Sequence, residues 1–456
     1  MEAHGPMISE PDPQPGLQPD RFAFLHIDLN SFFASVEQQL HPEYRGRPLA
    51  VVPTHADTTC CIAASYEAKA LGIKTGTQVG EAKRLCPQII LVMGEHGVYA
   101  DYSRRIAQAV ERCCPVAHTP SIDEMVCELM GREREPPRAR QIALAIKQAI
   151  RDDVGESLRC SIGMAPNRFL AKIASDMQKP DGLIGLLPSQ LPRAIAHIEL
   201  RDLIGVGART EARLNAKGIF TMPQLLALDR AGMHALWNSV WGDRLYHWLR
   251  GAEAGDDGAP IDSGVQKSLG HSHVLGPEHR TPEGAWAVAH KLLHKAAMRL
   301  RMERLTASAM GVTIRYALTR EQVSQAENAG RRAKKHFSGL RHSGWAMEAR
   351  FAPCQDTLTL LEALRGAWAL RPQGAEFARP FHVAVTLHNL IAESDLQAPL
   401  FADPNNRAEL AATMDRLNRK YGLATLHLAG MLAAKESAPT RIAFTQIPVK
   451  FGIDYV

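Results

Sequence analysis

The feature that most constrains this chain is the alternation of short apolar runs with amphipathic segments over residues 22–186. Four runs of strand type lie at 22–28, 48–53, 121–129 and 158–164. Patterns of helical spacing lie between or beside them at 31–40, 99–114, 138–153 and 166–178. Asn30 or Ser31 is the expected cap of the first helix. Strands that alternate with helices predict an α/β or α+β domain ending near residue 186.

The remainder of the chain divides by composition. Residues 188–253 are helical in pattern with short breaks, and the Gly-, Asp- and Pro-rich stretch 254–265 is typical of a linker. A basic helix is expected at 283–304, followed by β-type runs near 307–318, 345–352 and 380–391. These elements predict a small second α/β domain. The tail from residue 405 offers one further helix.

Charge is distributed unevenly along the chain. The net charge is +5, but residues 288–350 hold 13 Lys or Arg and 4 Asp or Glu, a local excess of +9 that leaves −4 for the rest. A basic region on a nearly neutral body indicates a polyanionic partner. The alternative is an ordinary solvated helical face.

Targeting and disulfide signals are weak. The first twenty residues are proline-rich and lack an apolar core, so we expect a disordered lead and no signal peptide. No run approaches the roughly 18 apolar residues of a membrane span. The eight cysteines form no CxxC pair, which argues against a disulfide framework or a zinc site. A reducing cytoplasm is the expected compartment.

Three carboxylates stand at the ends of strand-type runs. Asp28 ends the first run, and Asp123 and Glu124 are adjacent within the third. Oxygen ligands of this kind suit hard divalent cations, and a pair of such ions can support phosphoryl transfer. Adjacent residues of a flat strand point to opposite faces, so a shared site requires a turn or bulge at Asp123. By spacing alone, caps or surface charges are the more usual explanation of such residues.

The segment LIGVGARTEARLNAKGI has the pattern of a helix-hairpin-helix. Gly205 and Gly207 would form a tight turn whose backbone N–H groups face a phosphate near a helix N-terminus. Contacts of this kind ignore base sequence. A plain helix-turn capped by glycine is the structural alternative.

Five ordered motifs resemble those of the Y-family, or translesion, DNA polymerases, and are nearest to the bacterial DNA polymerase IV class. They are HIDLNSFFASVE at 26–37, SYEAKALGI at 65–73, PSIDEMVCEL at 120–129, APNRFLAKIASDMQKPDG at 165–182 and the hairpin at 204–218. Any one of them is weak, but five in the family's order are specific. The resemblance covers residues 22 to about 390.

The resemblance implies an α+β multidomain fold, the right-hand polymerase architecture. Its parts would be a disordered lead at 1–20, a palm at 21–32 and 97–186, fingers at 33–96, a helical thumb at 187–253, a linker at 254–266, a little finger at 267–391 and a tail at 392–456. The basic second domain would then be the little finger, which in the family grips duplex DNA through its backbone.

The resemblance also assigns residues. Asp28, Asp123 and Glu124 match the metal-binding carboxylates, and the carbonyl of Leu29 matches a backbone ligand. These would hold two Mg²⁺ ions, for which Mn²⁺ can substitute. The nucleotide-binding positions are Phe32, Phe33, Tyr66, Lys69 and Lys179. Phe33 falls on the steric gate that excludes a ribose 2′-OH, whereas core packing is its plain alternative. Tyr66, Lys69 and Lys179 would hold the triphosphate.

Three positions depart from the family pattern. Asn30 stands where a second aspartate is usual, and activity should survive this change. Lys69 replaces an arginine, which gives a point charge in place of a bidentate fork. Ala63 replaces a hydroxyl residue near the triphosphate. The last two departures bear on nucleotide affinity and leave the reaction class unchanged.

The expected activity is DNA-directed synthesis on a primer–template with dNTPs, of low fidelity and tolerant of lesions. A non-catalytic adaptor of a mutagenesis complex is the main rival, and a simple DNA-binding module is a more distant one. The segment TQIPVKF at 445–451 is a candidate sliding-clamp peptide. No membrane partner is expected, and we expect a monomer.

Overall fold

The computed structural model describes residues 19–57, 59–252, 267–328, 334–335, 341–374, 377–396, 406–422 and 425–434. These residues fall into two compact units, one ending at 252 and one beginning at 267. Residues 1–18 of the predicted lead, the predicted linker 254–266 and the candidate clamp segment 445–451 lie outside the described residues. The boundaries between palm, fingers and thumb stay predictions.

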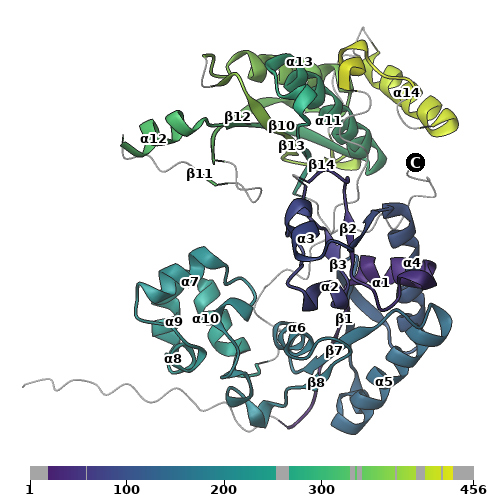
Figure 1. Ribbon diagram of the computed structural model, residues 1–456, viewed down its shortest axis with the longest axis vertical. Coiled ribbons are helices and arrows are strands. Elements are labelled where there is room, and N and C mark those ends of the chain that lie inside the picture. Colours follow the sequence, from purple (N-terminus) through teal and green to yellow (C-terminus); the bar gives the residue numbers. More distant parts are fainter. Residues whose placement is uncertain are drawn as a thin grey trace, which may run out of the picture. The chain divides into compact units, whose positions relative to one another are not determined.

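The first unit is built on a five-stranded sheet of order β5-β6-β1-β7-β8, of which Figure 1 labels β1, β7 and β8. Its pairs are antiparallel except for β7 with β8. The strands are β1 (Phe24–Leu29), β5 (Val116–Ser121), β6 (Glu124–Glu128), β7 (Cys160–Ala165) and β8 (Leu183–Gly185). The central strand β1 has neighbours on both sides and is wholly buried.

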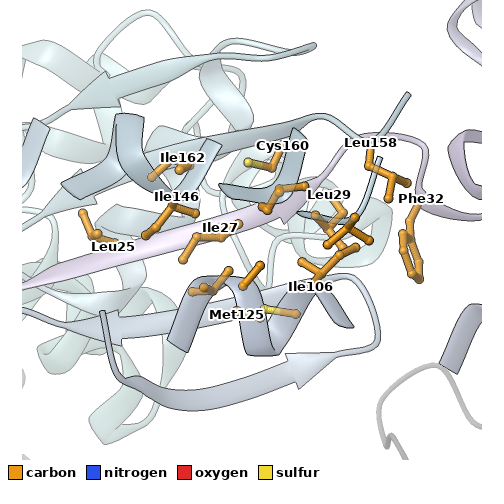
Figure 2. Packing of buried hydrophobic residues seen from close by; sticks show 14 of the residues in the cluster. Leu25, Ile27, Leu29, Phe32, Ile106, Met125, Ile146, Leu158, Cys160 and Ile162 are labelled. Carbon is orange, nitrogen blue, oxygen red and sulfur yellow. The ribbon is translucent and has the colours of Figure 1, made fainter. Parts of the chain in front are cut away.

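The two faces of β1 serve different purposes because successive side chains of a strand alternate. Leu25, Ile27 and Leu29 enter the main apolar core, which Figure 2 shows from close by. His26 and Asp28 point to the opposite face, toward α6. The helices that follow the sheet strands in this unit are α1 (Phe32–Leu40), α4 (His96–Glu111), α5 (Pro136–Asp153) and α6 (Arg168–Met177), with short turns η1 (Pro42–Tyr44) and η2 (Gly131–Arg134).

Helix α6 lies unusually close to strand β7, and Gly163 is the residue that permits it. A Cβ atom at this position would lie 2.0 Å from the Ala171 carbonyl oxygen and 2.4 Å from the Ser175 nitrogen. Both are helix backbone atoms, which cannot rotate away as a side chain can. Gly163 therefore sets the height of α6 above the sheet, and with it the position of every side chain that α6 directs at β1.

A smaller three-stranded sheet of order β3-β2-β4 has its own core. Its strands are β2 (Leu49–Val52), β3 (Ala63–Ala64) and β4 (Ile90–Met93), and its helices are α2 (Tyr66–Ala70) and α3 (Val79–Leu85). Strand β2 pairs parallel with β4 and antiparallel with β3. Ala63 and Ala64 are both buried, so small side chains line this short strand.

The first unit ends in a helical region that packs on α6 through a second apolar cluster. It contains the short turns η3 (Pro188–Gln190), η4 (Arg193–Ile195) and η5 (Leu200–Asp202), and helices α7 (Ala208–Asn215), α8 (Met222–Leu226), α9 (Arg230–Trp237) and α10 (Val240–Trp248). Buried Asn167 joins this region to α6. Its Oδ1 accepts from the Leu170 N–H at 2.8 Å, and its Nδ2 donates to the carbonyls of Trp248 and Ala252 at 3.0 and 2.9 Å.

The second unit is an antiparallel sheet of order β11-β12-β10-β13-β9, with β14 paired to β10. Its strands are β9 (Ser268–Val274), β10 (Leu305–Ala317), β11 (Lys334–Lys335), β12 (Arg341–Cys354), β13 (Pro380–His388) and β14 (Ile391–Ala392). Its helices and turns are η6 (Pro277–His279), α11 (Pro282–Met302), α12 (Arg320–Asn328), α13 (Thr357–Ala369), η8 (Glu393–Asp395), α14 (Arg407–Tyr421) and η9 (Ala429–Ala434). Helices α11 and α13 share one apolar core with the inward side chains of the sheet.

Segments after the second sheet fold back on α11. Arg301 of α11 pairs with Asp415 of α14 through two contacts of 2.6 and 2.9 Å, and both side chains are largely buried. Ala434 of η9 joins the apolar core of the unit. In the part of the chain that the structure describes, each helix is too short or too polar to span a bilayer.

Candidate active site

Asp28 and Glu124 lie next to each other at the ends of two central strands. They are direct partners in the antiparallel pairing of β1 with β6. Opposed residues of such a pair project from the same face of the sheet, so both carboxylates point toward α6. Asp28 is only 7% exposed, and Glu124 is partly buried. The pairing register therefore brings together two of the three predicted carboxylates.

Asp123 lies in a two-residue turn, and the expectation of one strand over 121–129 was wrong. Ser121 of β5 pairs with Glu124 of β6, which leaves Ile122 and Asp123 as the turn. The Ser121 hydroxyl lies 2.6 Å from Asp123 Oδ1 and 3.0 Å from Glu124 Oε2. Both carboxylates thus reach one hydroxyl, which resolves the difficulty of adjacent side chains facing opposite ways. The two turn residues include no glycine or proline that would have indicated a turn in the sequence. The side chain of Ile122 packs in the core.

Two lysines surround the carboxylates. Lys172 of α6 places Nζ 2.7 Å from Asp28 Oδ2 and 2.6 Å from Glu124 Oε1. Lys179, in the loop after α6, places Nζ 2.7 Å from Asp28 Oδ1. Each ammonium also contacts Asp176, at 3.2 Å from Lys172 and 2.8 Å from Lys179. Asp28 therefore has one lysine on each of its oxygens.

The surroundings shift the pKa values of Asp123 and Glu124 in opposite directions. Burial raises the pKa of Asp123, and the charges of Asp28 and Glu124 add to this effect. Burial would also raise the pKa of Glu124, but the hydrogen bond and charge of Lys172 outweigh it and the pKa falls. Burial opposes the charge of Lys172, yet Asp28 and Glu124 prevail and raise its pKa. Glu124 and Lys172 form a charged pair, whereas the charge of Asp123 is disfavoured.

His26 lies beneath this group on β1. Its Nδ1 lies 3.1 Å from the Ser175 hydroxyl, and its Nε2 lies 3.9 Å from Glu124 Oε1. Burial, with the nearby charge of Lys172, lowers the pKa of His26 to about 4. The imidazole is neutral at physiological pH and acts as a fixed polar support under Glu124.

The donors fit a hard divalent cation. Within the described ranges, no group of three or more His, Cys, Asp and Glu side chains is arranged to hold a metal ion. One position, now taken by the Lys172 ammonium, nevertheless lies within 2.7 Å of carboxylate oxygens from both Asp28 and Glu124. A cation there has oxygen ligands, and its charge would relieve the buried Asp123. The backbone of Leu29 is at the same edge, because its N–H donates to the Asp123 carbonyl at 2.9 Å.

The predicted triphosphate residues gather beside Asp28. Tyr66 begins α2, and Lys69 Nζ lies 4.4 Å from the centroid of its ring. Lys69 also donates to the Ser31 hydroxyl at 2.7 Å. Burial raises the pKa of Tyr66, while the charge of Lys179 opposes this, which indicates that the phenol and the ammonium are near neighbours. Two lysines and a phenol thus border the carboxylates, and their role toward a nucleotide stays a prediction.

The two phenylalanines of α1 are both packed in the core. Phe33 is 6% exposed and stacks on Tyr99 with ring centroids 4.3 Å apart and an angle of 14°. Phe32 is 3% exposed, with its centroid 5.6 Å from that of Phe33. Packing alone accounts for both side chains. The gate function of Phe33 and nucleotide contact by Phe32 stay predictions.

Ser31 is the N-cap residue of α1, as expected for Asn30 or Ser31, but neither side chain makes the capping hydrogen bond. Ser31 occupies the cap position with φ of 49°, but its hydroxyl caps no helix N–H and accepts from Lys69 instead. Asn30 is buried, and its amide donates to the Ser161 hydroxyl at 3.1 Å and accepts from the Asp181 N–H at 2.7 Å. These bonds connect β1 to the loop after α6. They stabilise the fold more than a capping bond would at the start of a helix that is already well packed.

Gly205 and Gly207 form an exposed turn before α7. Gly205 has φ of +86°, a conformation that favours glycine, and Gly207 is the N-cap residue of α7. The element before the turn is the short η5 and not a full helix. A Cβ atom on Gly207 would meet no atom within 4 Å, so the backbone there is open to a ligand. DNA contact at this turn stays a prediction.

The sequence-based site missed Lys172, Asp176 and Ser121. Lys172 and Asp176 are four residues apart within the motif 165–182, and Lys179 follows seven residues after Lys172. That spacing places Lys172 and Asp176 on one helix face, and it could have marked them. Ser121 gave no comparable signal, because its role depends on the turn.

Comparison with known proteins identifies the family of the chain. A model of the impB/mucB/samB family matches residues 27–176, and the model of that family's C-terminal domain matches residues 266–400. DNA polymerase IV of Moorella thermoacetica is 31% identical over 412 residues, covering 89% of this chain and 95% of that protein. DNA polymerase IV of Bacteroides fragilis is 37% identical over 253 residues, covering 55% of this chain and 67% of that protein.

A solved Y-family DNA polymerase chimera, Dbh-Dpo4(243-245)-Dbh, has a similar fold. It aligns with a TM-score of 0.64 at 22% identity and covers 81% of this chain and 99% of its own. The predicted α+β multidomain architecture is thereby confirmed. The fold and the sequence relatives are those of a polymerase of the translesion class. The chain belongs to the impB/mucB/samB family, the Y-family DNA polymerases, as its motifs predicted.

Proposed function

We propose that this chain is a DNA-directed DNA polymerase that adds deoxynucleotides to a primer 3′-hydroxyl and releases pyrophosphate, acting in lesion bypass. The observation that carries the proposal is the placement of Asp28 and Glu124 as direct neighbours across two strands, with Asp123 on the adjoining turn. Membership of the family supports the same activity.

Asp28, Asp123 and Glu124, with the carbonyl of Leu29, are the groups that would hold divalent metal ions. We assign two Mg²⁺ ions, for which Mn²⁺ can substitute. Bound ions of this kind lower the pKa of an attacking hydroxyl and neutralise charge on a leaving pyrophosphate. The chain's own contribution is fixed geometry. The β1–β6 register sets two carboxylates, and the Ser121 hydroxyl orients the third.

Lys179, Lys69 and Tyr66 would bind the triphosphate of the incoming nucleotide. Their two ammonium groups and one phenol offer charged and neutral donors to an anion that carries several negative charges. The Lys179 ammonium is paired with Asp28 and with the partly exposed Asp176, so binding a phosphate would require it to exchange or share one of these partners. Positioning and charge stabilisation of this sort supply most of the acceleration in phosphoryl transfer.

Phe33 would exclude ribonucleotides by contact with the sugar. Its ring is held rigidly by the Tyr99 stack, and Tyr99 in turn donates to Glu37 Oε1 at 2.5 Å. A gate must resist displacement, and a ring packed against a second aromatic side chain does so.

Primer–template DNA is the proposed macromolecular partner. The local +9 charge of residues 288–350 falls largely on α11, β10 and β12 of the second unit. Binding to the phosphate backbone should weaken steeply with salt. The open backbone at Gly205 and Gly207 offers a second, sequence-independent contact.

A non-catalytic adaptor is the second candidate. Loss of the carboxylates would favour it, but this chain retains all three at one edge of the sheet. Primer extension with Mg²⁺ separates the two functions. The parent should extend a primer, and Asp123→Ala should reduce the rate at least about a hundredfold.

Glu128→Gln is the matched control, because Glu128 lies on the same strand as Glu124 but is exposed and far along β6. It should extend the primer as the parent does. Absence of extension by the parent, at any salt concentration that permits DNA binding, would refute the polymerase assignment and favour the adaptor.

A further inference from the structure

Lys172 occupies the point at which Asp28 and Glu124 converge. Its ammonium touches both acids, at 2.7 and 2.6 Å, so it already fills the role of a cation between them. The side chain is about one quarter exposed and comes from α6, an element separate from both strands. This lysine carries no role in the function proposed above.

A divalent ion and this ammonium compete for the same two oxygens. Mg²⁺ binds oxygen at about 2.0–2.1 Å and requires ligands on several sides, so the oxygens that face Lys172 are those it would need. Like charges a few ångströms apart in a partly buried site also repel each other more strongly than they would in water. Lys172 must therefore withdraw when a metal ion is bound.

Asp176 provides the place to which Lys172 can withdraw. It is one helical turn further along α6, its oxygens lie 3.2 and 3.3 Å from Lys172 Nζ, and its side chain is 38% exposed. Residues four apart on a helix are neighbours, so the ammonium needs only a side-chain rotation to contact Asp176 alone. When the Lys172 ammonium leaves Asp28 and Glu124, its charge therefore stays paired with Asp176.

We infer that Lys172 is a positioning residue and internal counter-ion, which holds Asp28 and Glu124 together before metal binding and transfers to Asp176 as the metal ion arrives. This inference rests on the proposed metal site at Asp28. Lys172 then sets how tightly that site binds divalent ions, and Asp176 lowers the cost of vacating it. Lys172 competes with the metal ion for the carboxylate oxygens of Asp28 and Glu124 and does not help to bind it.

The test is Mn²⁺ binding to the full chain without DNA, measured at pH 7.5 from the electron paramagnetic resonance signal of free Mn²⁺. Lys172→Met should bind Mn²⁺ about tenfold more tightly than the parent, equivalent to about 1.4 kcal/mol. Lys172→Arg keeps the charge and should stay near the parent. A residue with a merely structural role would weaken binding when removed.

Asp176→Asn completes a double-mutant cycle. Alone it should weaken Mn²⁺ binding several-fold, because Lys172 loses its alternative partner. In the Lys172→Met background the same substitution should have little effect, since no ammonium remains to be relocated. Equal effects of Asp176→Asn in the two backgrounds would overturn the role of Asp176.

Two outcomes separate this inference from the proposed function. If Asp28→Asn abolishes Mn²⁺ binding but Lys172→Met fails to tighten it, the inference is wrong and the metal site stands. If no Mn²⁺ binding depends on Asp28, both are wrong. Circular dichroism of each variant shows whether it is folded. If Lys172→Met does not fold, Lys172→Arg is the variant that tests the charge at this position.

Discussion

The contact between Gly163 and α6 predicts that one methyl group will damage both stability and catalysis. In Gly163→Ala the new Cβ would start 2.0 Å from the Ala171 carbonyl oxygen, whereas ordinary contact begins near 3.4 Å. Helix α6 must therefore move more than about 1 Å away from β7. Overpacking of this kind costs about 1–3 kcal/mol, and more where the opposing atoms are backbone that cannot rotate away.

The same displacement carries Lys172 and the loop of Lys179 away from Asp28. A misplacement of about 1 Å in a catalytic constellation can reduce the rate about a hundredfold. Gly97→Ala is the matched control, because Gly97 is exposed in the first turn of α4 and a Cβ there would meet no atom within 4 Å. That variant should match or slightly exceed the stability of the parent.

Hydrogen exchange at increasing urea, read by mass spectrometry on peptides from β7 and α6, measures the stability of the first unit separately from the second. Gly163→Ala should lower the free energy of opening in those peptides and leave peptides from α11 and β10 unchanged. Primer extension on the same preparations measures the rate. A Gly163→Ala protein that is as stable and as active as Gly97→Ala would refute the close-packing argument.

Three further outcomes are expected. Asp123→Asn should stabilise the metal-free protein in EDTA at pH 7, because folding raises the pKa of Asp123 and so disfavours its ionised form. The gain should shrink as the pH falls through the raised pKa of folded Asp123 and be lost below the ordinary value of 3.8, where the acid is protonated in both states; a gain independent of pH in urea unfolding would contradict this. Phe33→Ala should raise the efficiency of rNTP over dNTP incorporation in single-nucleotide extension, and unchanged selectivity would leave Phe33 a packing residue. Tyr66→Phe should raise the KM for dNTP about tenfold with little change in kcat, the loss of one hydrogen bond to a charged ligand; an unchanged KM would remove Tyr66 from the nucleotide site.

The sequence was a good guide wherever one strand or helix decides the position of a residue. Asp28 was expected at the end of a buried strand, and it is there because alternation places Leu25, Ile27 and Leu29 in the core and leaves Asp28 on the other face. The family, the fold class and the polymerase assignment followed from five motifs in order, and the comparisons agree.

Prediction failed where position depends on two elements at once. A turn or bulge at Asp123 was expected only if the two acids share a site; the turn itself is decided by the pairing of β5 with β6, and the run 121–129 alone indicated one strand. Lys172 was overlooked because its contact with Asp28 joins residues 144 apart in the chain. Core packing was an expected alternative for Phe33, but its partner Tyr99 lies on α4, far along the chain, and the sequence did not identify it. In each case the missing information is a long-range packing contact.

The bonds made by Asn167 have a mechanical consequence. One amide group caps the first turn of α6 and holds the carbonyls of Trp248 and Ala252, the last part of the first unit that the structure describes. A displacement of the segment 248–252 would therefore act on the N-terminus of α6, the helix that carries Lys172. Because Lys172 contacts Asp28 and Glu124, such a displacement would reach two of the carboxylates.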